Sequence, residues 1–227
     1  MTTTEITEAE QVRLRFLQVD TANVCDVLDE MGYVDQALSG SFLPQPPTAP
    51  SFGGWAFTIR GEMASYPLAD GDKKKMLACE QIGPGEVSVW GGGADGIALF
   101  GDMIAYRMQA QGCVGAIIDG GVRDLAPLHE QGFPVFARYR AAVQSIGRWR
   151  VIEHGTPVTL PGATNDVVVH PGDFILADQS GAVVVPKDAV LEVLKRTEAL
   201  QEQERALRVD LEAGMSLDDA LKKFGHV

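Results

Sequence analysis

The stretch that decides the fold runs from Gly101 to Asp124 and reads GDMIAYRMQAQGCVGAIIDGGVRD. Its first half, 102–111, has no proline or glycine and is rich in Met, Ala, Gln and Arg, which favour helices. Gly112 then ends the helix, as glycine commonly does just beyond a helix terminus. The apolar run 114–118 has the composition of a strand, and the Asp-Gly-Gly sequence at 119–121 is typical of a turn. The stretch therefore predicts a helix, a tight turn, a strand and a loop.

The lengths of this helix and strand bring the two ends of the stretch together. About ten helical residues rise roughly 15 Å and five strand residues span about 17 Å, so an antiparallel return places Arg123 and Asp124 beside Asp102. The first N–H groups of the helix, including those of Met103 and Ile104, lack intrahelical partners and can bind a carboxylate. Taken alone, an Arg-Asp pair is usually a surface ion pair, and an Asp that opens a helix is usually a cap. Their convergence favours a metal-assisted site for an anionic substrate.

Length and composition narrow the class of protein. The chain has 227 residues, of which 45% are hydrophobic and 22% charged, as in a soluble globular protein with one domain, or one domain plus an appendage. The 25 glycines and 12 prolines indicate many turns, as in a mixed α/β fold. The formal charge of −12, from 31 acidic and 19 basic residues, repels phosphate backbones and argues against a nucleic-acid partner.

Cysteine usage and the terminal sequence predict a cytoplasmic protein. The three cysteines, Cys25, Cys79 and Cys113, have no metal-site spacing and fall in elements expected to be buried, so we expect core thiols in a reducing compartment. The first ten residues are polar and acidic and lack the apolar core of a signal peptide. No apolar run approaches the length of a membrane span, so we expect no membrane partner.

Upstream of the deciding stretch, the sequence predicts helices, strands and one irregular connection. Lys73, Lys74 and Lys75 lie in the first turns of one helix, where a solvated face is their default explanation and help in holding an anion the alternative. The glycines at 91–93 permit close approach of the backbone to a ligand. The expected elements are helices over 4–16, 20–31 and 70–81, an irregular connection over 39–51, and strands over 54–60, 62–66 and 87–90.

Downstream, alternating and apolar segments separated by Gly-Pro turns predict a run of strands. From Lys187 the sequence becomes helical and charged, with a narrow apolar stripe, and Ser216 resembles the cap of a last helix. Such a helix buries too little apolar surface to stand alone, so we expect the extension over 187–227 to pack on a neighbouring subunit, beside a main domain over 1–186. The expected elements are a helix over 125–131 and strands over 135–139, 149–153, 157–160, 166–169, 174–178 and 182–185.

Three segments resemble the RraA-like family: the deciding stretch together with GFPVFAR at 132–138, PGDFILAD at 171–178, and GAVVVP at 181–186. The family contains divalent-metal pyruvate aldolases that act on 4-hydroxy-4-methyl-2-oxoglutarate and 4-carboxy-4-hydroxy-2-oxoadipate. It also contains the ribonuclease E inhibitor RraA, which is not an aldolase. The aldolase motif is Asp, twenty residues, then Arg-Asp, and Asp102 with Arg123-Asp124 matches it. The resemblance runs from about 21 to 186 and implies a layered α/β fold with a central β-sandwich or barrel flanked by helices.

The resemblance also implies a role for each site residue. Asp124 would bind the metal directly and Asp102 through metal-bound water. Arg123 would contact the substrate carbonyl oxygen, and the amides of Met103 and Ile104 would hold the substrate carboxylate, with Gly101 also in contact with the substrate. A further acid would come from the C-terminal region of a partner subunit in a homotrimer or a dimer of trimers. Glu204 is the first candidate for this acid, with Glu198 and Glu202 as rivals.

The activity implied by the resemblance is a retro-aldol cleavage that releases pyruvate from a 4-hydroxy-2-oxo acid, with Mg²⁺ or Mn²⁺ as cofactor. Mg²⁺ prefers oxygen ligands and often takes only one or two protein carboxylates, which suits a site with few acids and no His or Cys cluster. A metal and a guanidinium at the enolate oxygen stabilise the charge that develops there, and no lysine is needed as a Schiff base. The same enolate arises from oxaloacetate, so decarboxylation of oxaloacetate is an expected side activity.

Other functions fit the sequence less well. RraA-type regulators of ribonuclease E carry Gly where Asp102 stands and acidic residues soon after the Arg-Asp pair, whereas this chain has Ala-Pro-Leu at 126–128. A relative acting on another oxo acid is a third possibility. The four histidines show no metal-site pattern, and no Gly-x-Ser-x-Gly motif supports a hydrolase. No nucleotide-binding glycine motif supports a methyltransferase.

Overall fold

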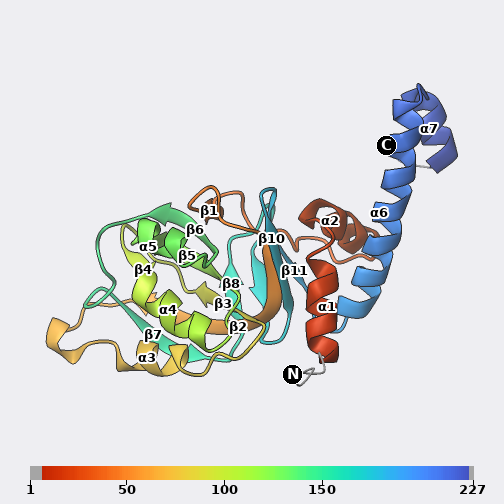
Figure 1. Cartoon of the computed structure of the whole chain (residues 1–227). Coiled ribbons are helices and arrows are strands. Elements are labelled where there is room, and N and C mark those ends of the chain that lie inside the picture. The colour runs from red at the N-terminus through yellow and green to blue at the C-terminus, as the bar shows by residue number, and fades with distance from the viewer. Residues whose placement is uncertain (1–6, 225–227) are drawn as a thin grey trace, which may run out of the picture.

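The computed structural model describes residues 7–224 and shows a mixed α/β fold built on one long, curved sheet (Figure 1). Seven strands follow the order β1-β6-β5-β3-β2-β10-β11, with β4 added beside β5 and β7 beside β2, and β8 and β9 form a separate two-stranded sheet. The curved sheet is nearly closed, like a barrel, and helices flank it (Figure 1). The predicted fold class is therefore confirmed.

The helices and strands were expected in nearly all their places. The helices are α1 Glu8–Phe16, α2 Thr21–Glu30, a 3-10 turn Leu68–Asp70, α3 Lys73–Cys79, α4 Asp102–Ala110, α5 Leu125–Glu130, α6 Val190–Glu212 and α7 Leu217–Phe224. The strands are β1 Leu43–Gln45, β2 Phe52–Met63, β3 Glu86–Gly91, β4 Ala98–Phe100, β5 Gly115–Val122, β6 Val135–Arg140, β7 Trp149–His154, β8 Val158–Leu160, β9 Val167–Val169, β10 Phe174–Asp178 and β11 Gly181–Val185.

Strand β5 lies at the centre of the parallel part of the sheet. It pairs in parallel with β3, β4 and β6, and all eight of its residues are buried. A strand covered on both faces requires apolar or small residues at every position, which explains the unbroken run of Ala, Ile, Gly and Val around Asp119. The segment that leaves β5 at Arg123 is therefore attached to a strand that is buried along its whole length.

Three groups of buried apolar side chains hold the layers together. The first lies under α3, α4 and α5 and includes Trp90, Phe100 and Trp149. The second lies between the sheet and the β8–β9 hairpin. The third joins β10 and β11 to α1, α2 and the first half of α6, on the other side of the molecule (Figure 1). None of the described helices is long and apolar enough to cross a membrane.

The sequence prediction was wrong at two places in the sheet. Asp119, Gly120 and Gly121 form no turn but continue β5. Glycine is needed at 120 and 121 because neighbouring groups approach these positions closely. A methyl group at Gly121 would lie 2.5 Å from the carbonyl oxygen of Ile97 and 2.7 Å from the ring of Tyr139. The segments 54–60 and 62–66 are not two strands: β2 continues through Gly61 with an irregularity in its pairing to β7 and ends at Met63.

Other differences concern short elements and burial. Strands β1 and β4 were not expected, since three residues are too few to show a period. The first helix begins at Glu8, and the part of the expected helix before Thr7 lies outside the described residues. The cysteines carry no disulfide, and Cys79 and Cys113 are buried as expected, whereas Cys25 is only partly buried.

The packing at Gly121 leads to the first prediction. Gly121→Ala should lower the free energy of unfolding by roughly 1–3 kcal/mol, because the added methyl group meets a backbone oxygen that cannot rotate away. Urea unfolding followed by circular dichroism measures this change. Gly40→Ala is the control, because Gly40 is exposed and has nothing within 4 Å of the added methyl group. Equal stability of the two variants would contradict the close packing at the end of β5.

Candidate active site

The start of α4 and the end of β5 border a small cavity of about 180 Å³, the space of about six water molecules in the liquid. Its walls come from four separate parts of the chain: the first turn of α3, the segment from β4 into α4, the loop after β5, and the segment before β7. The residues that line it are Asp72, Lys75, Met76, Ala98, Leu99, Phe100, Gly101, Asp102, Met103, Ile104, Arg123, Asp124, Gln144, Ser145 and Ile146.

The backbone ties the end of β5 to the start of α4. The Arg123 N–H donates to the Phe100 carbonyl oxygen at 3.1 Å, so Arg123 lies beside the chain that enters α4. A methyl group at Gly101 would lie 2.5 Å from Asp124 Oδ2 and 3.2 Å from Arg123 Cγ. Glycine at this position therefore lets the Arg-Asp pair pack against the helix start. The structure thus brings Gly101, Asp102, Arg123 and Asp124 together around one cavity, as the sequence predicted.

Asp102 covers part of the helix terminus. Gly101 occupies the cap position of α4 and offers no side chain, whereas Asp102 Oδ1 accepts a hydrogen bond from the Met103 N–H at 2.8 Å. A carboxylate bound at this terminus would therefore share the Met103 amide with Asp102 or displace it. The side chain of Met103 is exposed at the rim of the cavity, and the side chain of Ile104 is partly buried.

Arg123 and Asp124 form a partly exposed pair, with Arg123 Nε 3.2 Å from Asp124 Oδ2. Asp124 has a left-handed backbone, with φ 59° and ψ 43°, and occupies the cap position of α5. This conformation costs on the order of 1–3 kcal/mol for a residue other than glycine, and Asp is among the residues that accept it most readily. About a third of the Asp124 side chain and 42% of the Arg123 side chain are exposed, so both can contact a ligand.

The donor set suits a hard divalent ion with few protein ligands. Among the described residues no group of three or more His, Cys, Asp or Glu side chains could enclose a metal. Asp102 and Asp124 nevertheless line the same cavity, and neither has more than one side-chain hydrogen bond recorded. Mg²⁺ commonly keeps several waters and takes only one or two carboxylates, so these two acids fit such an ion.

Sequence reasoning missed the role of Lys75 as a cavity residue. Lys75 is 4% exposed, unlike the exposed Lys73 and Lys74, so the solvated face predicted for the three lysines is wrong at this position. Its ammonium donates to the Leu99 carbonyl oxygen and to Ser145 Oγ, and it lies 5.3 Å from the centre of the Trp90 ring. Burial lowers its pKa from 10.5 to about 8. The spacing of Lys75 to the buried Ala78, Cys79 and Ile82 is the helical signal that marks it as inward-facing.

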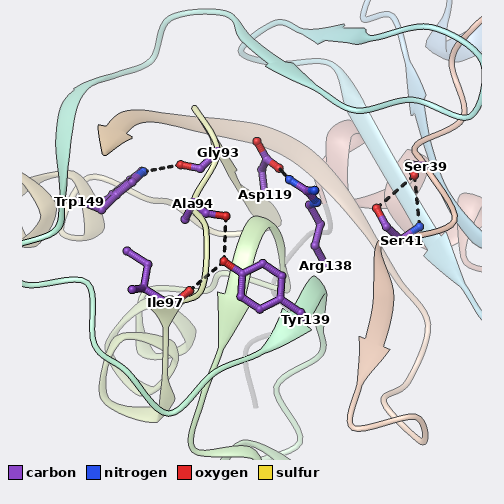
Figure 2. Close-up of polar contacts among 9 residues, drawn as sticks. All are labelled: Ser39, Ser41, Gly93, Ala94, Ile97, Asp119, Arg138, Tyr139 and Trp149. Atoms are coloured by element: carbon purple, nitrogen blue, oxygen red, sulfur yellow. Dashed lines mark hydrogen bonds and ion pairs between the residues drawn. The ribbon is translucent and has the colours of Figure 1, made fainter. Parts of the chain in front are cut away.

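The glycines at 91–93 serve packing within the chain. Gly92 has φ 101°, and a methyl group there would lie 1.9 Å from the Gly61 carbonyl oxygen. Figure 2 shows how the following segment is held: Trp149 Nε1 donates to the Gly93 carbonyl, and the Tyr139 hydroxyl bonds the carbonyls of Ala94 and Ile97. These contacts fix the segment that leads into β4 and then into the cavity. The close approach made possible by glycine here is to the chain itself.

An ion pair between a buried acid and a partly exposed arginine lies beside this segment. Arg138 Nη1 is 2.9 Å from Asp119 Oδ1, and the Asp119 side chain is only 6% exposed (Figure 2). A buried carboxylate without a partner is costly, so the pair accounts for an acid in the middle of the apolar strand β5. Asp119 and Arg138 are not among the residues that line the cavity.

The predicted C-terminal acids do not reach this cavity within one chain. Glu204 Oε2 accepts a hydrogen bond from Asn23 Nδ2 at 2.8 Å, on the α2 side of the molecule. Glu198 pairs with Arg15, and Glu202 pairs with Arg205. All three acids lie on α6 and none lines the cavity. A contribution from any of them to the site requires a second subunit.

Comparisons with known proteins find similar sequences over most of the chain. A model of the RraA-like family, described as Aldolase/RraA, matches residues 21–184. "Uncharacterized protein MJ0644" of Methanocaldococcus jannaschii is 31% identical over 66% of this chain, and a "putative 4-hydroxy-4-methyl-2-oxoglutarate aldolase" of Pseudomonas fluorescens is 31% identical over 73% of it. This chain spans 65% of the first relative and 93% of the second, and a further relative is matched over only 33% of its length.

Two solved structures share the whole architecture. An uncharacterized protein from Pseudomonas syringae pv. tomato superposes with a TM-score of 0.83 at 27% identity, covering 98% of both chains, so the similarity extends across the C-terminal helices. RraAS2 of Streptomyces coelicolor, described as an unusual member of the RNase ES inhibitor RraA family, superposes with a TM-score of 0.77 at 24% identity. The superposition covers 90% of this chain and 98% of RraAS2, and it shows that the two proteins share a fold.

The burial of Lys75 predicts a change of stability with pH. The pKa of Lys75 in the folded chain, about 8, lies below its ordinary value of 10.5. Between these two pH values the unfolded chain therefore binds more protons than the folded chain. As a result, the contribution of Lys75 to the free energy of unfolding rises with pH. Asp72 and Cys79 oppose this lowering of the pKa and Arg123 adds to it. The stability of the wild type should therefore rise relative to that of Lys75→Met between pH 7.5 and 9.5, as urea unfolding would measure. Parallel pH profiles for the two proteins would contradict the burial of a charged ammonium.

Proposed function

This chain belongs to the RraA-like family, and from that premise we propose that it is a metal-dependent aldolase. The proposed reaction cleaves a 4-hydroxy-2-oxo acid, such as 4-hydroxy-4-methyl-2-oxoglutarate, and releases pyruvate. The observation that carries this proposal is the position of Asp102, Arg123 and Asp124 around one cavity at the N-terminus of α4. Relatives named as aldolases of this kind at about 30% identity support it.

The residues of the cavity suit the three parts of a 2-oxo acid. The N-terminus of α4 presents backbone N–H groups at Met103 and Ile104 for the carboxylate. Asp124 and Asp102 would hold Mg²⁺ or Mn²⁺, which supplies positive charge beside the substrate carbonyl oxygen when it is bound. The half-exposed guanidinium of Arg123 would donate hydrogen bonds to the same oxygen.

Breaking the C3–C4 bond leaves an electron pair on the pyruvate fragment, and the carbonyl oxygen takes up the negative charge. The C4 hydroxyl loses its proton to water as C4 becomes a carbonyl, and C3 of the enolate takes a proton from water to give pyruvate. A fixed guanidinium at this oxygen stabilises the charge more in the transition state than in the ground state, which lowers the barrier. Asp124 packs closely against Gly101, and its ion pair with Arg123 limits where the guanidinium can lie. The same electron flow follows the loss of CO₂ from oxaloacetate, so decarboxylation of oxaloacetate belongs to the proposal.

The proposal includes a homo-oligomer, a trimer or a dimer of trimers, in which each C-terminal extension reaches a neighbour. We divide the chain into a catalytic domain over 1–186 and this extension over 187–227. The first half of α6 packs on its own chain through Val190, Val193 and Leu194, whereas Val209, Leu217 and Leu221 farther along are exposed. Figure 1 shows the second half of α6 and α7 extending away from the main body. In the proposed assembly Glu204, or its rivals Glu198 and Glu202, would enter the neighbour's cavity.

A protein-binding regulator like RraA is the alternative function. The fold is shared with RraAS2, so the fold does not separate the two functions. Asp102 favours the aldolase, because a regulator needs no carboxylate at the mouth of the helix. A chain that releases pyruvate from no oxo acid, and binds a ribonuclease instead, would support the regulator.

The aldolase proposal predicts a strict dependence on Asp124 and on a divalent ion. Asp124→Ala should lower kcat/KM for pyruvate release by a factor on the order of 10³ or more, since the metal loses its proposed direct ligand. EDTA should abolish the wild-type activity, and Mg²⁺ or Mn²⁺ should restore it. A coupled lactate dehydrogenase assay with 4-hydroxy-4-methyl-2-oxoglutarate and with oxaloacetate measures both effects.

Asp166→Ala is the matched control for this experiment. Asp166 is exposed in the turn between β8 and β9, and it does not line the cavity. This variant should retain wild-type activity, and both variants should keep the wild-type circular dichroism spectrum. Full activity in EDTA, or in Asp124→Ala, would contradict the metal-dependent reaction.

The proposed interface predicts complementation between inactive subunits. Asp124→Ala and Glu204→Gln should each be weakly active alone, while co-expressed mixtures should recover part of the activity. Recovery is expected because some interfaces then combine an intact Asp124 from one subunit with an intact Glu204 from its neighbour. Differently tagged subunits, purified in tandem and assayed for pyruvate release, provide the measurement.

Parallel mixtures with Glu198→Gln and Glu202→Gln identify the acid if Glu204 is not the one. Mixed oligomers that stay inactive with all three variants would contradict a shared site. A chain that light scattering finds to be monomeric and fully active would contradict it as well.

A further inference from the structure

We propose that Lys75 determines substrate specificity by attracting a second carboxylate group of the substrate. This group lies at the opposite end of the substrate from the 2-oxo acid group that the start of α4 would bind. The inference rests on the proposed function, because it assumes that the cavity binds a 2-oxo acid. It assigns a role to a residue outside the Asp102, Arg123 and Asp124 constellation.

The position of Lys75 supports this role. Its ammonium bonds the Leu99 carbonyl oxygen and Ser145 Oγ, and Lys75, Leu99 and Ser145 all line the cavity. Lys75 comes from α3, whereas the carboxylate-binding amides come from the start of α4. The cavity therefore has cationic or N–H donor groups on two different walls. A dicarboxylic oxo acid has an anionic group at each end to match them.

The charge of Lys75 is left without a carboxylate partner among the described residues. Its two hydrogen-bond acceptors, the Leu99 carbonyl oxygen and Ser145 Oγ, are neutral. An ammonium has three N–H donors, so these two acceptors leave one N–H for another group. Asp72 is the acid whose charge is felt at Lys75, but its oxygens accept from the backbone N–H groups of Lys75 and Val151. A buried cation with neutral partners is costly, and a bound carboxylate would offset this cost.

The surrounding groups keep the ammonium in place. The Trp90 ring lies 5.3 Å from Nζ, in the range of a cation–π contact, and the helix cap at Asp72 fixes the first turn of α3. Lys73 and Lys74 are exposed on the same turn, so their long side chains are freer to move. Lys75 alone of the three combines burial with a place at the cavity wall.

Two probes of equal chain length separate this role from the catalytic reaction. 2-Oxoglutarate carries a second carboxylate and 2-oxopentanoate carries a methyl group instead, and neither has the 4-hydroxyl group needed for cleavage. Isothermal titration calorimetry with the full-length protein and Mg²⁺ at pH 7 would give both dissociation constants. The wild type should bind 2-oxoglutarate roughly ten- to a hundredfold more tightly, as expected for one hydrogen bond between charged groups.

Lys75→Met should weaken the binding of 2-oxoglutarate by the same factor and leave the binding of 2-oxopentanoate within about twofold. Lys75→Gln, which keeps a donor but removes the charge, should fall between the wild type and Lys75→Met. Lys73→Met is the matched control, because it removes an equal charge from the same helix at an exposed position, and it should bind both probes like the wild type.

The outcomes separate this inference from the proposed function. Equal affinity of the wild type for the two probes, or an equal loss for both probes in Lys75→Met, would overturn the role of Lys75 while leaving an oxo-acid site intact. If the wild type binds neither probe, the oxo-acid site itself fails and the role of Lys75 fails with it. Equal wild-type affinities overturn the inference even if Lys75→Met does not fold, and a wild-type preference is assigned to Lys75 by its loss in Lys75→Met or Lys75→Gln.

Discussion

The hydrogen bond from the Arg123 N–H to the Phe100 carbonyl oxygen is the contact on which the candidate site depends. It joins the end of the buried strand β5 to the chain entering α4, so that Phe100 and Arg123, distant in the sequence, lie side by side at the cavity. The absence of a side chain at Gly101 then allows Asp124 to lie against the helix start. A helix terminus alone is a common feature of proteins. A helix terminus with a guanidinium and two carboxylates fixed beside it is a specific chemical environment.

The rigidity of this arrangement comes from outside the cavity. β5 is paired on both sides and buried throughout, and Tyr139 on the neighbouring strand β6 holds the segment that runs from the glycines into β4. A left-handed Asp124 is tolerated because Arg123 before it is bonded to Phe100 and α5 after it packs into the core through Leu128. Displacing a charged group by about 1 Å can remove much of its effect on a reaction, so the packing around Gly121 matters for the chemistry proposed at Asp124.

Local sequence signals predicted most of this, and long-range contacts explain the rest. The helix over 102–111 and its end at Gly112 depend on residues close in sequence, and the structure agrees within one residue. The glycines at 120–121 were assigned to a turn because turn propensity is local, whereas their actual reason is the approach of Ile97 and Tyr139. Lys75 was hidden among three lysines, since which face of α3 is buried depends on packing against distant strands. The spacing to Ala78 and Cys79 contained the missing information.

The acidic net charge of the chain makes two cations of the cavity, Lys75 and Arg123, more important for the proposed binding of an anionic substrate. A protein with a formal charge of −12 repels small anions at long range, although salt screens this repulsion beyond about 8 Å at physiological ionic strength. Lys75 and Arg123 both line the cavity, where distances are shorter and screening is weaker, so both cations would attract the proposed anionic substrate at short range. Asp102 and Asp124 would otherwise make the same cavity repulsive. In the proposed reaction a divalent ion held by these acids would offset their charge, which would favour the binding of an anionic substrate after the metal.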